Sequence, residues 1–437
     1  MCRRKKRGGA VIDLAACVSQ VADLVDRALV DHHKVVALIA ERIARKMGLP
    51  DHVCDNVVVA ALVHDIGALS ASERLATLSF DYDDSFTHCE PGYLLLRQYL
   101  PFEEIAHIVR MHHVRWRDGA GTTYLGELVP LESHIIHLAD RAAVLIDPSV
   151  PVLDQGDNIV ARIVDHAGSR FLPEAVEAFV RLAHEEVFWL DIVSIPSGAQ
   201  MLDGLRTKGS GDLEWEDLKP FARMISRIVD FRSAFTATHT AGVTSTAVAL
   251  GTLLGMDEEH VSRIGVAGSL HDVGKLAVPT EILEKPGPLD AREWAQMRAH
   301  TYYTYKVLAG GGVLSEIAGS AAYHHERLDE TGYPFHIGVS GLDESARLMA
   351  VADIFTAVLE DRPYRAGMSK DQAVSVLREG AAGNATDPRI VEALIEDFEH
   401  INDMRVLAQA ERWQEFVDFN RALGERAAAV QAARPGS

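Results

Sequence analysis

The amino-acid sequence predicts an all-α protein made of two copies of one helical domain. Apolar residues recur at three- and four-residue spacing along most of the 437-residue chain, as in helices that bury one face. Alternating β-branched runs and Asn-Gly turns, the usual strand signals, are almost absent. Histidine and aspartate residues also recur at shared intervals in the two halves. A chain of this length, with 48% hydrophobic residues, is expected to form two or three domains with sizeable cores.

The spacing of apolar residues predicts where the helices lie, and a change in composition predicts where the chain divides into domains. We expect helices in the first half at residues 18–47, 51–63, 91–100, 102–113, 131–146 and 173–190. Residues 194–212 are rich in Gly, Pro and Ser, which predicts a linker. The predicted parts are an N-terminal domain (1–193), the linker (194–212), a C-terminal domain (213–402) and a helical appendage for packing or oligomerisation (403–437).

The net charge and the spacing of the cysteines limit which classes of protein the chain can belong to. Asp and Glu number 63 against 43 Lys and Arg, so the net charge of −20 argues against a general nucleic-acid or anionic-membrane binder. The basic start at 3–7 is followed by a stretch that Asp13 interrupts, without the unbroken apolar region of a signal peptide, and no run of about 18 apolar residues predicts a membrane span. Cys2, Cys17, Cys54 and Cys89 show no C-x-x-C spacing, so we expect reduced thiols in a cytoplasmic protein.

The internal repeat is carried by histidines and aspartates. The second half contains His239, His271, Asp272, His300, His324, His325 and Asp353, and the first half contains His32, His64, Asp65, His88, His112, His113 and Asp140. In each half the first two histidines are 32 residues apart, and the third and fourth are 24 apart. His33 makes the first position ambiguous, and the 32-residue interval favours His32. Such agreement predicts a tandem duplication of one domain.

These residue types predict a metal centre. Burying so many ionisable groups without partners would cost several kcal/mol each, so we expect them to converge on cations. Imidazole and carboxylate without thiolate suit iron, manganese or zinc, and seven candidate ligands suit two ions. Two ions that activate a water to hydroxide suggest hydrolysis of a phosphoester. Lys275 follows Asp272 by three residues and is either a phosphate-stabilising group or a surface lysine. Arg327, Arg362 and Arg365 are either phosphate contacts or plain surface charges.

The second half resembles the HD-GYP family of HD-type metal-dependent phosphohydrolases over about residues 235–400. The resemblance rests on an ordered set of motifs: HDVGK at 271–275, ILEKPG at 282–287, HHER at 324–327, GYP at 332–334, VAD at 351–353 and RPYR at 362–365. It implies tandem HD-type helical domains, a centre that often holds iron or manganese, and hydrolysis of the second messenger cyclic di-GMP to pGpG and then GMP.

The resemblance also implies roles for individual residues. The metal ligands would be the seven second-half residues named above, with Asp272 and Lys275 as catalytic residues. Arg327, Gly332, Tyr333, Pro334 and Arg362 would border the substrate.

Three positions depart from the family pattern. Phe235 stands where some members have a glutamate that holds a third metal, which favours two ions. Thr301 replaces a common proline, and Glu330 replaces a usual glycine. Glu330 adds negative charge near a dianionic substrate and keeps other nucleotides open as substrates.

The first copy keeps the ligand pattern but not the remaining motifs. Ala68 stands in the place of Lys275, and residues 114–121 contain no Gly-Tyr-Pro. This half therefore resembles a plain HD domain. Three interpretations remain open: a second metal hydrolase with another substrate and the seven first-half residues as ligands, a metal-bound but inactive regulatory domain, or a pairing module.

We expect a signalling phosphodiesterase whose C-terminal copy hydrolyses cyclic di-GMP. One alternative is hydrolysis of another cyclic dinucleotide or nucleotide phosphate, and another is a catalytically silent receptor. A homodimer or a signalling-protein partner is expected, without nucleic-acid or membrane partners.

Overall fold

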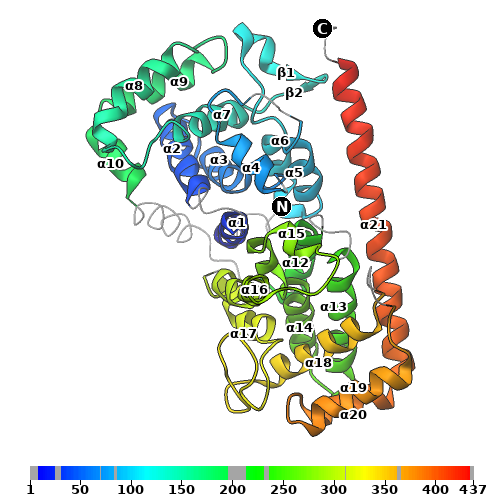
Figure 1. The fold of residues 1–437 in the computed structure, drawn as a ribbon. Coiled ribbons are helices and arrows are strands. Elements are labelled where there is room, and N and C mark those ends of the chain that lie inside the picture. Colours follow the sequence, from blue (N-terminus) through cyan, green and yellow to red (C-terminus); the bar gives the residue numbers. More distant parts are fainter. Residues whose placement is uncertain are drawn as a thin grey trace. The chain divides into compact units, whose positions relative to one another are not determined.

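The computed structural model confirms the all-α fold (Figure 1). The structure describes residues 8–24, 31–68, 70–82, 86–194, 213–230, 236–310, 312–361 and 366–433. Within these ranges the one sheet is a two-stranded antiparallel pair. The chain forms two compact units: unit 1 comprises Met1–Asp212 with Arg421–Ser437, and unit 2 comprises Leu213–Asn420. Of the linker expected at 194–212, only Ser194 lies among the described residues.

Unit 1 is a set of short helices. Its elements are α1 (Gly8–Asp23), α2 (His32–Lys46), α3 (Asp51–Val63), α4 (Ala71–Thr77), α5 (Cys89–Leu96), η3 (Leu100–Phe102), α6 (Glu103–Arg110), η4 (Arg117–Thr122), β1 (Thr123–Tyr124), β2 (Glu127–Leu128), α7 (Leu131–Ala143), α8 (Val152–Val164), α9 (Pro173–Ala183) and α10 (Glu186–Val193). Helix α2 packs against α3 and α7. Val36, Ile39 and Ile43 form its fully buried face, at the three- and four-residue spacing of one side of a helix.

The single helix expected at 18–47 is wrong. Helix α1 ends at Asp23, and α2 begins at His32 after Asp31, whose φ of 66° is left-handed. Apolar residues continue in helical spacing across this break, so periodicity alone could not reveal it. The helix expected at 173–190 is likewise divided into α9 and α10.

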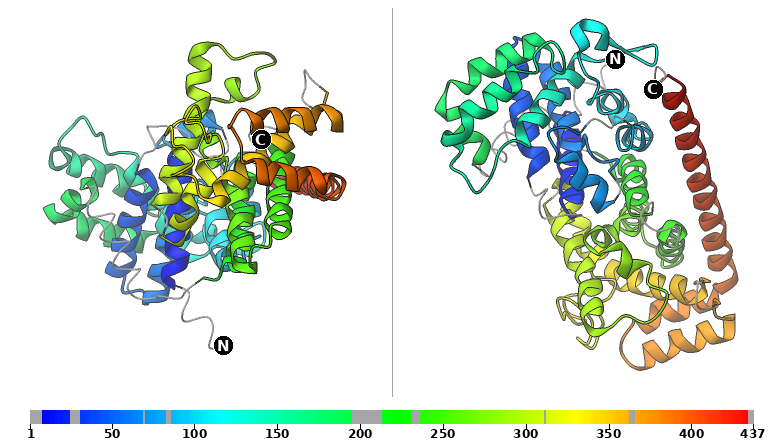
Figure 2. Two further views of the ribbon diagram at one scale, coloured as in Figure 1. Left: turned by 90° about the horizontal axis from the view of Figure 1, so that it is seen from below. Right: turned by 45° about the horizontal axis from the view of Figure 1, so that its top comes forward.

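Unit 2 is built around helices α13, α14 and α18. Its elements are α12 (Trp215–Asp230), α13 (Thr236–Leu253), α14 (Glu258–Leu270), η5 (Val273–Ala277), α15 (Thr280–Leu283), α16 (Ala291–Ala309), η6 (Gly312–Ile317), α17 (Ala318–Ala322), α18 (Glu344–Leu359), α19 (Lys370–Ala382), α20 (Pro388–Glu396) and α21 (Phe398–Ala433) up to Asn420. Helix α13 packs against α14 and α18. Val243, Leu250, Leu348 and Phe355 are fully buried in the core that these helices share. Figure 2 shows α21 as one unbroken helix.

The ends of several unit 2 helices are fixed by side-chain caps. The Asp290 carboxylate accepts hydrogen bonds from the backbone N–H groups of Arg292 and Glu293 at the start of α16. Asp257 caps α14 and Asp343 caps α18 in the same manner. Each cap satisfies backbone donors that have no partner within the helix. The helices that carry His300 and Asp353, and the helix that His271 follows, are therefore held at defined starting points.

Each unit contains, within itself, a close backbone contact that only glycine permits. A Cβ atom on Gly67 would lie 2.0 Å from the carbonyl oxygen of His88, and one on Gly274 would lie 1.9 Å from that of His300. Both distances are far below van der Waals contact, so a side chain at either position would force the helices apart. Each unit therefore holds its third repeated histidine against the turn that carries the His-Asp pair.

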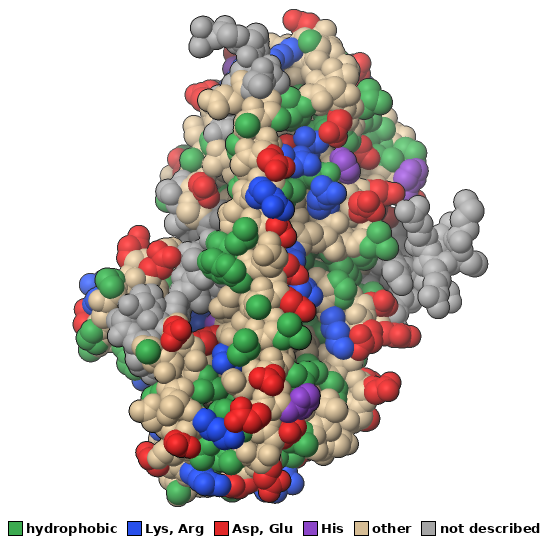
Figure 3. All heavy atoms as spheres, turned by 90° about the vertical axis from the view of Figure 1, so that its right-hand side faces the viewer, with side chains coloured by type: hydrophobic (Ala, Val, Ile, Leu, Met, Phe, Trp, Pro, Cys, Tyr) green, Lys and Arg blue, Asp and Glu red, His purple; other side chains and the backbone are tan. Residues whose placement is uncertain are grey.

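The surface of the protein carries many charged side chains. Acidic and basic side chains are interspersed on the face that Figure 3 shows. No helix among the described residues is long and apolar enough to cross a bilayer.

Candidate metal centre

In unit 2, five separate segments bring the predicted ligands together. His239 lies on α13, His300 on α16 and Asp353 on α18, while the two adjacent pairs lie at helix ends. His271 and Asp272 follow the end of α14, and His324 and His325 follow α17. Two groups have ligand atoms within 4.8 Å of one another: His239, His271 and Asp353, and His300, His324 and His325.

Asp272 connects the two groups. Its Oδ2 lies 3.1 Å from Nε2 of His271, and its Oδ1 lies 3.4 Å from Nε2 of His300. Nε2 of His300 lies 3.4 Å from Nε2 of His324. A second carboxylate, Asp353, lies 3.1 Å from Nε2 of His239 through Oδ1 and 3.8 Å from Nδ1 of His325 through Oδ2. Each carboxylate thus presents its two oxygens to different histidines, as a bridging ligand does.

The backbone orients three of the imidazoles. Nδ1 of His271, His300 and His324 lies 2.8, 2.6 and 2.8 Å from the carbonyl oxygens of residues 268, 297 and 321. Since a carbonyl only accepts, each Nδ1 carries the proton and each Nε2 lone pair faces the centre. Nε2 of His271 and Oδ1 of Asp272 are buried and make no hydrogen bond with any described residue. Buried acceptors of this kind fit a bound cation.

The pKa shifts give the second group the protonation state of metal ligands. Burial lowers the pKa of His300 to about 3 and also lowers the pKa values of His324 and His325. Burial opposes ionisation of Asp272 and Asp353, but His271 and Lys275 hold the pKa of Asp272 below the usual range, and the hydrogen bond from His239 does the same for Asp353. Neutral imidazoles and ionised carboxylates are the forms that bind metal ions.

His239 is held differently, by a carboxylate that sequence reasoning missed. Its Nδ1 lies 2.8 Å from Oε2 of Glu360, which follows the end of α18. Burial favours the neutral imidazole, yet Glu360 and Asp353 together raise the pKa of His239 to about 10. The other Glu360 oxygen accepts a hydrogen bond from Gln409 of α21. Glu360 thus fixes the ring with Nε2 toward Asp353, and no local motif marks this residue in the sequence.

Lys275 lies beside Asp272. Its Nζ donates to Oδ2 of Asp272 at 2.6 Å, and its side chain is 18% exposed. The ammonium therefore reaches the ligand sphere and also retains access to solvent.

The Gly-Tyr-Pro loop is organised by a buried carboxylate. Glu326 accepts hydrogen bonds from the backbone N–H groups of Phe335 at 2.7 Å and Ile337 at 3.2 Å. A Cβ atom on Gly332 would lie 2.4 Å from Cα of Glu326, so the loop can close over Glu326 only with glycine there. The Tyr333 ring is 4.9 Å from that of His325. The loop therefore borders the second ligand group.

The structure gives fewer contacts for the other residues that were predicted to border the substrate. Arg327 is exposed, with Nη1 3.5 Å from Oγ1 of Thr331, and Pro334 is half-buried in the loop. Arg362 and Arg365 lie outside the described residues. Two residues that sequence reasoning missed, Trp294 and Arg298 of α16, lie 6.2 and 5.8 Å from the Tyr333 ring. Together they extend the Tyr333 face with another aromatic ring and a guanidinium.

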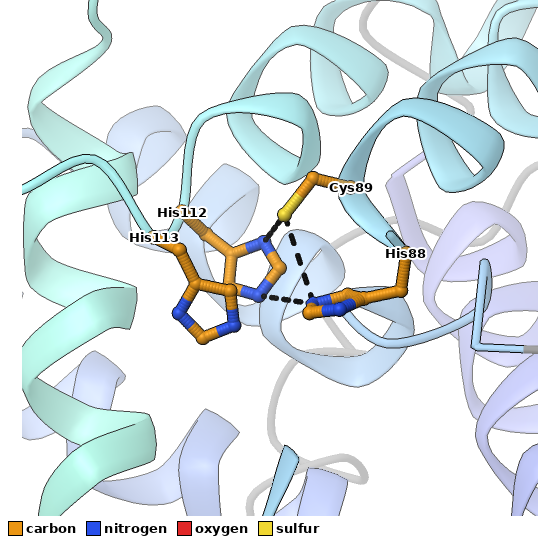
Figure 4. Close-up of side chains that lie close together, drawn as sticks. All are labelled: His88, Cys89, His112 and His113. Atoms are coloured by element: carbon orange, nitrogen blue, oxygen red, sulfur yellow. Dashed lines mark hydrogen bonds between the residues drawn. The ribbon is translucent and has the colours of Figure 1, made fainter. Parts of the chain in front are cut away.

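In unit 1 the predicted residues also converge, again in two groups. Nε2 of His32 lies 3.3 Å from Oδ1 of Asp140, and Nε2 of His64 lies 3.8 Å from the same oxygen. Asp65 lies 3.4 Å from Nε2 of His64 and 3.1 Å from Nε2 of His88. The second group comprises His88, His112 and His113, together with Cys89 (Figure 4).

His33 is also close to this centre. Its ring centroid lies 5.0 Å from that of His64, and its Nδ1 lies 3.6 Å from a carboxylate oxygen of Asp23. His32 is the member of the pair that faces Asp140, as the repeat interval favoured.

A buried arginine distinguishes unit 1 from unit 2. The Arg141 side chain is fully buried and donates to Oδ2 of Asp140 at 3.0 Å from Nε and 2.5 Å from Nη2. It also donates to the carbonyl oxygens of Thr77 and Ser79. Ile354 occupies the corresponding place after Asp353. One oxygen of Asp140 is thus taken by a fixed guanidinium.

The centres also differ in solvent access. The His325 side chain is 29% exposed in unit 2, whereas its counterpart His113 is 3% exposed in unit 1. Only the centre in unit 2 therefore has an opening at this ligand.

Comparison with known proteins shows the family to which the chain belongs. The HD-domain family matches residues 29–145 and again residues 223–390. The chain therefore carries two HD domains in tandem and belongs to the HD-domain family, as expected.

Similar proteins share one enzyme class. The chain is 26% identical over 416 residues to the 3′3′-cGAMP-specific phosphodiesterase 1 of Vibrio cholerae, covering 91% of this chain and 94% of that protein. It is 32% identical over 204 residues to the cyclic di-GMP phosphodiesterase response regulator RpfG of Xanthomonas campestris, covering 46% of this chain and 53% of that protein. The expected enzyme class, phosphodiesterase, is confirmed at this level.

A solved structure shares the fold. The crystal structure of a cyclic GMP-AMP specific phosphodiesterase from V. cholerae superposes with a TM-score of 0.61 at 22% identity. The match covers 89% of this chain and 97% of that one, so the similarity in fold extends through both units.

Proposed function

We propose that unit 2 is the catalytic centre of a metal-dependent phosphodiesterase that hydrolyses a 3′,5′-linked cyclic dinucleotide. The observation that carries this proposal is the pair of ligand groups joined by Asp272, in which Nε2 of His271 and Oδ1 of Asp272 are buried and make no hydrogen bond with any described residue. Unit 1 lacks the equivalents of Lys275 and of the Gly-Tyr-Pro loop, and we assign it no part in this hydrolysis.

The residues of unit 2 have distinct tasks in this reaction. The two ligand groups would hold two divalent ions, with iron or manganese suited to nitrogen and oxygen ligands. Such ions supply Lewis acidity and lower the pKa of a bound water. Lys275 is placed to neutralise a phosphate oxygen as negative charge develops on it. Asp272 orients the Lys275 ammonium, and water adds to phosphorus as the P–O3′ bond breaks to give a linear dinucleotide.

The surroundings of the centre support a nucleotide substrate. Tyr333 places an aromatic ring beside His325, Trp294 lies next to Tyr333, and nucleobases stack on such rings. Arg298 adds a cation at the same place, within a chain of net charge −20. A local cation is what an anionic substrate requires in an otherwise acidic protein.

Two cyclic dinucleotides are the candidate substrates. Cyclic di-GMP is favoured by the ordered motifs at 271–275 and 332–334. 3′3′-cGAMP is favoured by the relative of that specificity, because the match spans 94% of that protein rather than one domain of it. Glu330 is exposed in the loop and is the residue whose charge a substrate would meet there.

The experiment is turnover of both nucleotides by the full chain purified anaerobically and loaded with Fe(II) or Mn(II). Wild type is compared with His271→Ala/Asp272→Ala and with the matched unit 1 variant His64→Ala/Asp65→Ala. We expect hydrolysis to be lost in the first variant and retained in the second. If the metal-loaded wild type binds either nucleotide without hydrolysing it, the chain is a receptor. Turnover of neither, with turnover of another nucleotide, would reassign the substrate.

A further inference from the structure

Unit 2 contains a cavity of about 390 Å³ next to the carboxylate that orients His239. The polar part of its lining comes from two residues that follow α18, Glu360 and Asp361, and from three residues of α21, namely Arg405, Gln409 and Trp413. None of the candidate metal ligands lines this cavity. It is therefore a place separate from the candidate metal centre.

Three side chains of α21 reach the cavity from one face of the helix. Arg405, Gln409 and Trp413 follow one another at four-residue spacing, which places them along one side of a helix. The Gln409 amide donates to Glu360. A Cβ atom on Gly242 of α13 would lie 2.8 Å from Nε2 of Gln409, so glycine at 242 leaves room for this amide. The helix thus presents a guanidinium, an amide and an indole to the cavity.

Arg405 is a buried cation whose hydrogen-bond partners are neutral. The residue is 6% exposed. Its Nε and Nη2 donate to Oδ1 of Asn402 at 3.1 and 2.8 Å, and its Nη1 donates to Oε1 of Gln409 at 2.6 Å. These bonds use three of the five N–H groups of a guanidinium, and both acceptors are uncharged amides. Because a buried charge is costly without full hydrogen bonding, the remaining donors suit a ligand with exposed acceptors.

Asp361 and Trp413 add an acceptor and an aromatic ring. Oδ1 of Asp361 accepts a hydrogen bond from the backbone N–H of Gly367 at 2.8 Å, and Oδ2 makes no hydrogen bond with any described residue. Trp413 is 47% exposed, and its ring is stacked with that of Phe416 at 5.5 Å between centroids. A planar ligand can stack on such an indole.

We propose that this cavity binds the guanine base of a nucleotide. Guanine carries the adjacent acceptors O6 and N7, which an arginine contacts with two hydrogen bonds. It also carries the adjacent donors N1–H and the 2-amino group, which suit the two oxygens of the Asp361 carboxylate. Its ring would stack on Trp413. Adenine lacks the adjacent donors, so the same carboxylate discriminates against it.

This recognition involves neither a metal ion nor the proposed hydrolysis, so each proposal can fail without the other. The test is isothermal titration of the metal-free full chain with GMP, and with AMP as the matched nucleotide. We expect GMP to bind at least about tenfold more tightly than AMP, since only GMP offers Asp361 both donors.

Two cavity variants and two controls locate the bound nucleotide. Trp413→Ala and Asp361→Asn should each weaken GMP binding at least about tenfold. The asparagine keeps an acceptor for the Gly367 N–H but replaces the other oxygen by an amino group. Asp371→Asn removes the same charge at an exposed position of α19, and Trp294→Ala removes the indole next to Tyr333. Both controls should bind GMP as wild type does.

A titration with cyclic di-GMP distinguishes two sources of the base. If Trp413→Ala weakens only GMP binding, the ligand is a free guanine nucleotide. If it weakens cyclic di-GMP binding as well, the cavity takes a base of the cyclic dinucleotide.

Circular dichroism establishes whether the variants are folded. Absence of GMP binding in wild type, equal binding of AMP, or wild-type affinity in folded Trp413→Ala and Asp361→Asn would overturn the proposal. Loss of GMP binding in Trp294→Ala would also overturn it, because the nucleotide would then lie beside Tyr333.

Discussion

Glu360 and His239 form the contact that fixes the first candidate ligand of unit 2, with Oε2 of Glu360 2.8 Å from Nδ1 of His239. The carboxylate raises the basicity of the imidazole and fixes which nitrogen faces Asp353. Replacing Glu360 by Gln keeps the shape but removes the charge. We expect roughly 10- to 100-fold weaker metal binding, since that is the usual effect of removing such an orienting group. Isothermal titration with Mn(II) measures it.

The matched control for Glu360→Gln is Glu344→Gln, which removes the same charge from an exposed pair with Arg389. Its Mn(II) affinity should equal that of wild type. Equal affinities in all three proteins would show that Glu360 does not orient a ligand.

Lys275→Met should slow catalysis while metal content is retained. The change keeps the aliphatic stem but removes the ammonium that contacts Asp272. Loss of a group that stabilises charge in the transition state lowers kcat by about 10²–10³. Steady-state kinetics with the active nucleotide separates this effect from a change in KM. Lys370→Met, at an exposed pair with Glu399, is the control. An unchanged kcat in Lys275→Met would make Lys275 a structural lysine.

Glu326→Gln should disturb the Gly-Tyr-Pro loop without removing a ligand. The carboxylate accepts two backbone hydrogen bonds, and an amide can accept only one of them while its NH₂ group opposes the other. Hydrogen bonds to a charged group contribute about 1.5–3 kcal/mol each, so the loop should lose order. We expect a raised KM with unchanged metal content. Glu330→Gln removes the same charge at an exposed position in this loop and should not raise KM.

Phe355→Ala should destabilise the fold of unit 2. Phe355 is fully buried on α18 and its ring contacts Phe398 with centroids 5.3 Å apart. Truncating a buried Phe usually costs about 3–5 kcal/mol of unfolding free energy. Urea denaturation followed by circular dichroism measures the loss. Leu253→Ala, at a 45% exposed position on α13, should cost much less. Similar midpoints for the two variants would contradict the described core.

Cys17 should be unreactive in the folded chain across the mildly alkaline range. Burial raises the pKa of its thiol to about 12 from the reference value of 9.0, so the native thiolate fraction near pH 9 is about a thousandfold lower than that of an open thiol. Because the unfolded thiol ionises first, this residue lowers stability as pH rises above about 9. Iodoacetamide labelling followed by mass spectrometry should modify Cys17 in urea but not in native protein. Rapid native labelling would show that α1 opens readily.

The repeated intervals in the sequence picked out residues that the fold of unit 2 brings close together, because residue type and spacing can be read from the sequence alone. The interval from His239 to His271 recurs between His32 and His64, and the structure brings both pairs near an aspartate. The all-α class followed from apolar periodicity for the same reason.

Residues whose role depends on packing could not be predicted. Glu360 and Arg141 are common residue types, and only the folded chain places them against His239 and Asp140. Cys89 has no partner cysteine nearby in sequence, so its position beside His88 and His112 carried no signal. The turn at residue 24 was hidden because apolar spacing continues past it.

The difference in exposure between His325 and His113 has a consequence for how each centre would gain and release an ion. At His325, water reaches the imidazole and can replace it on an ion one bond at a time, so exchange is a stepwise process of low barrier. At His113, the surrounding side chains must separate before any bond is exchanged, so the lifetime of an ion there is set by local unfolding of unit 1. The two copies of one fold would thus exchange their metal ions at different rates.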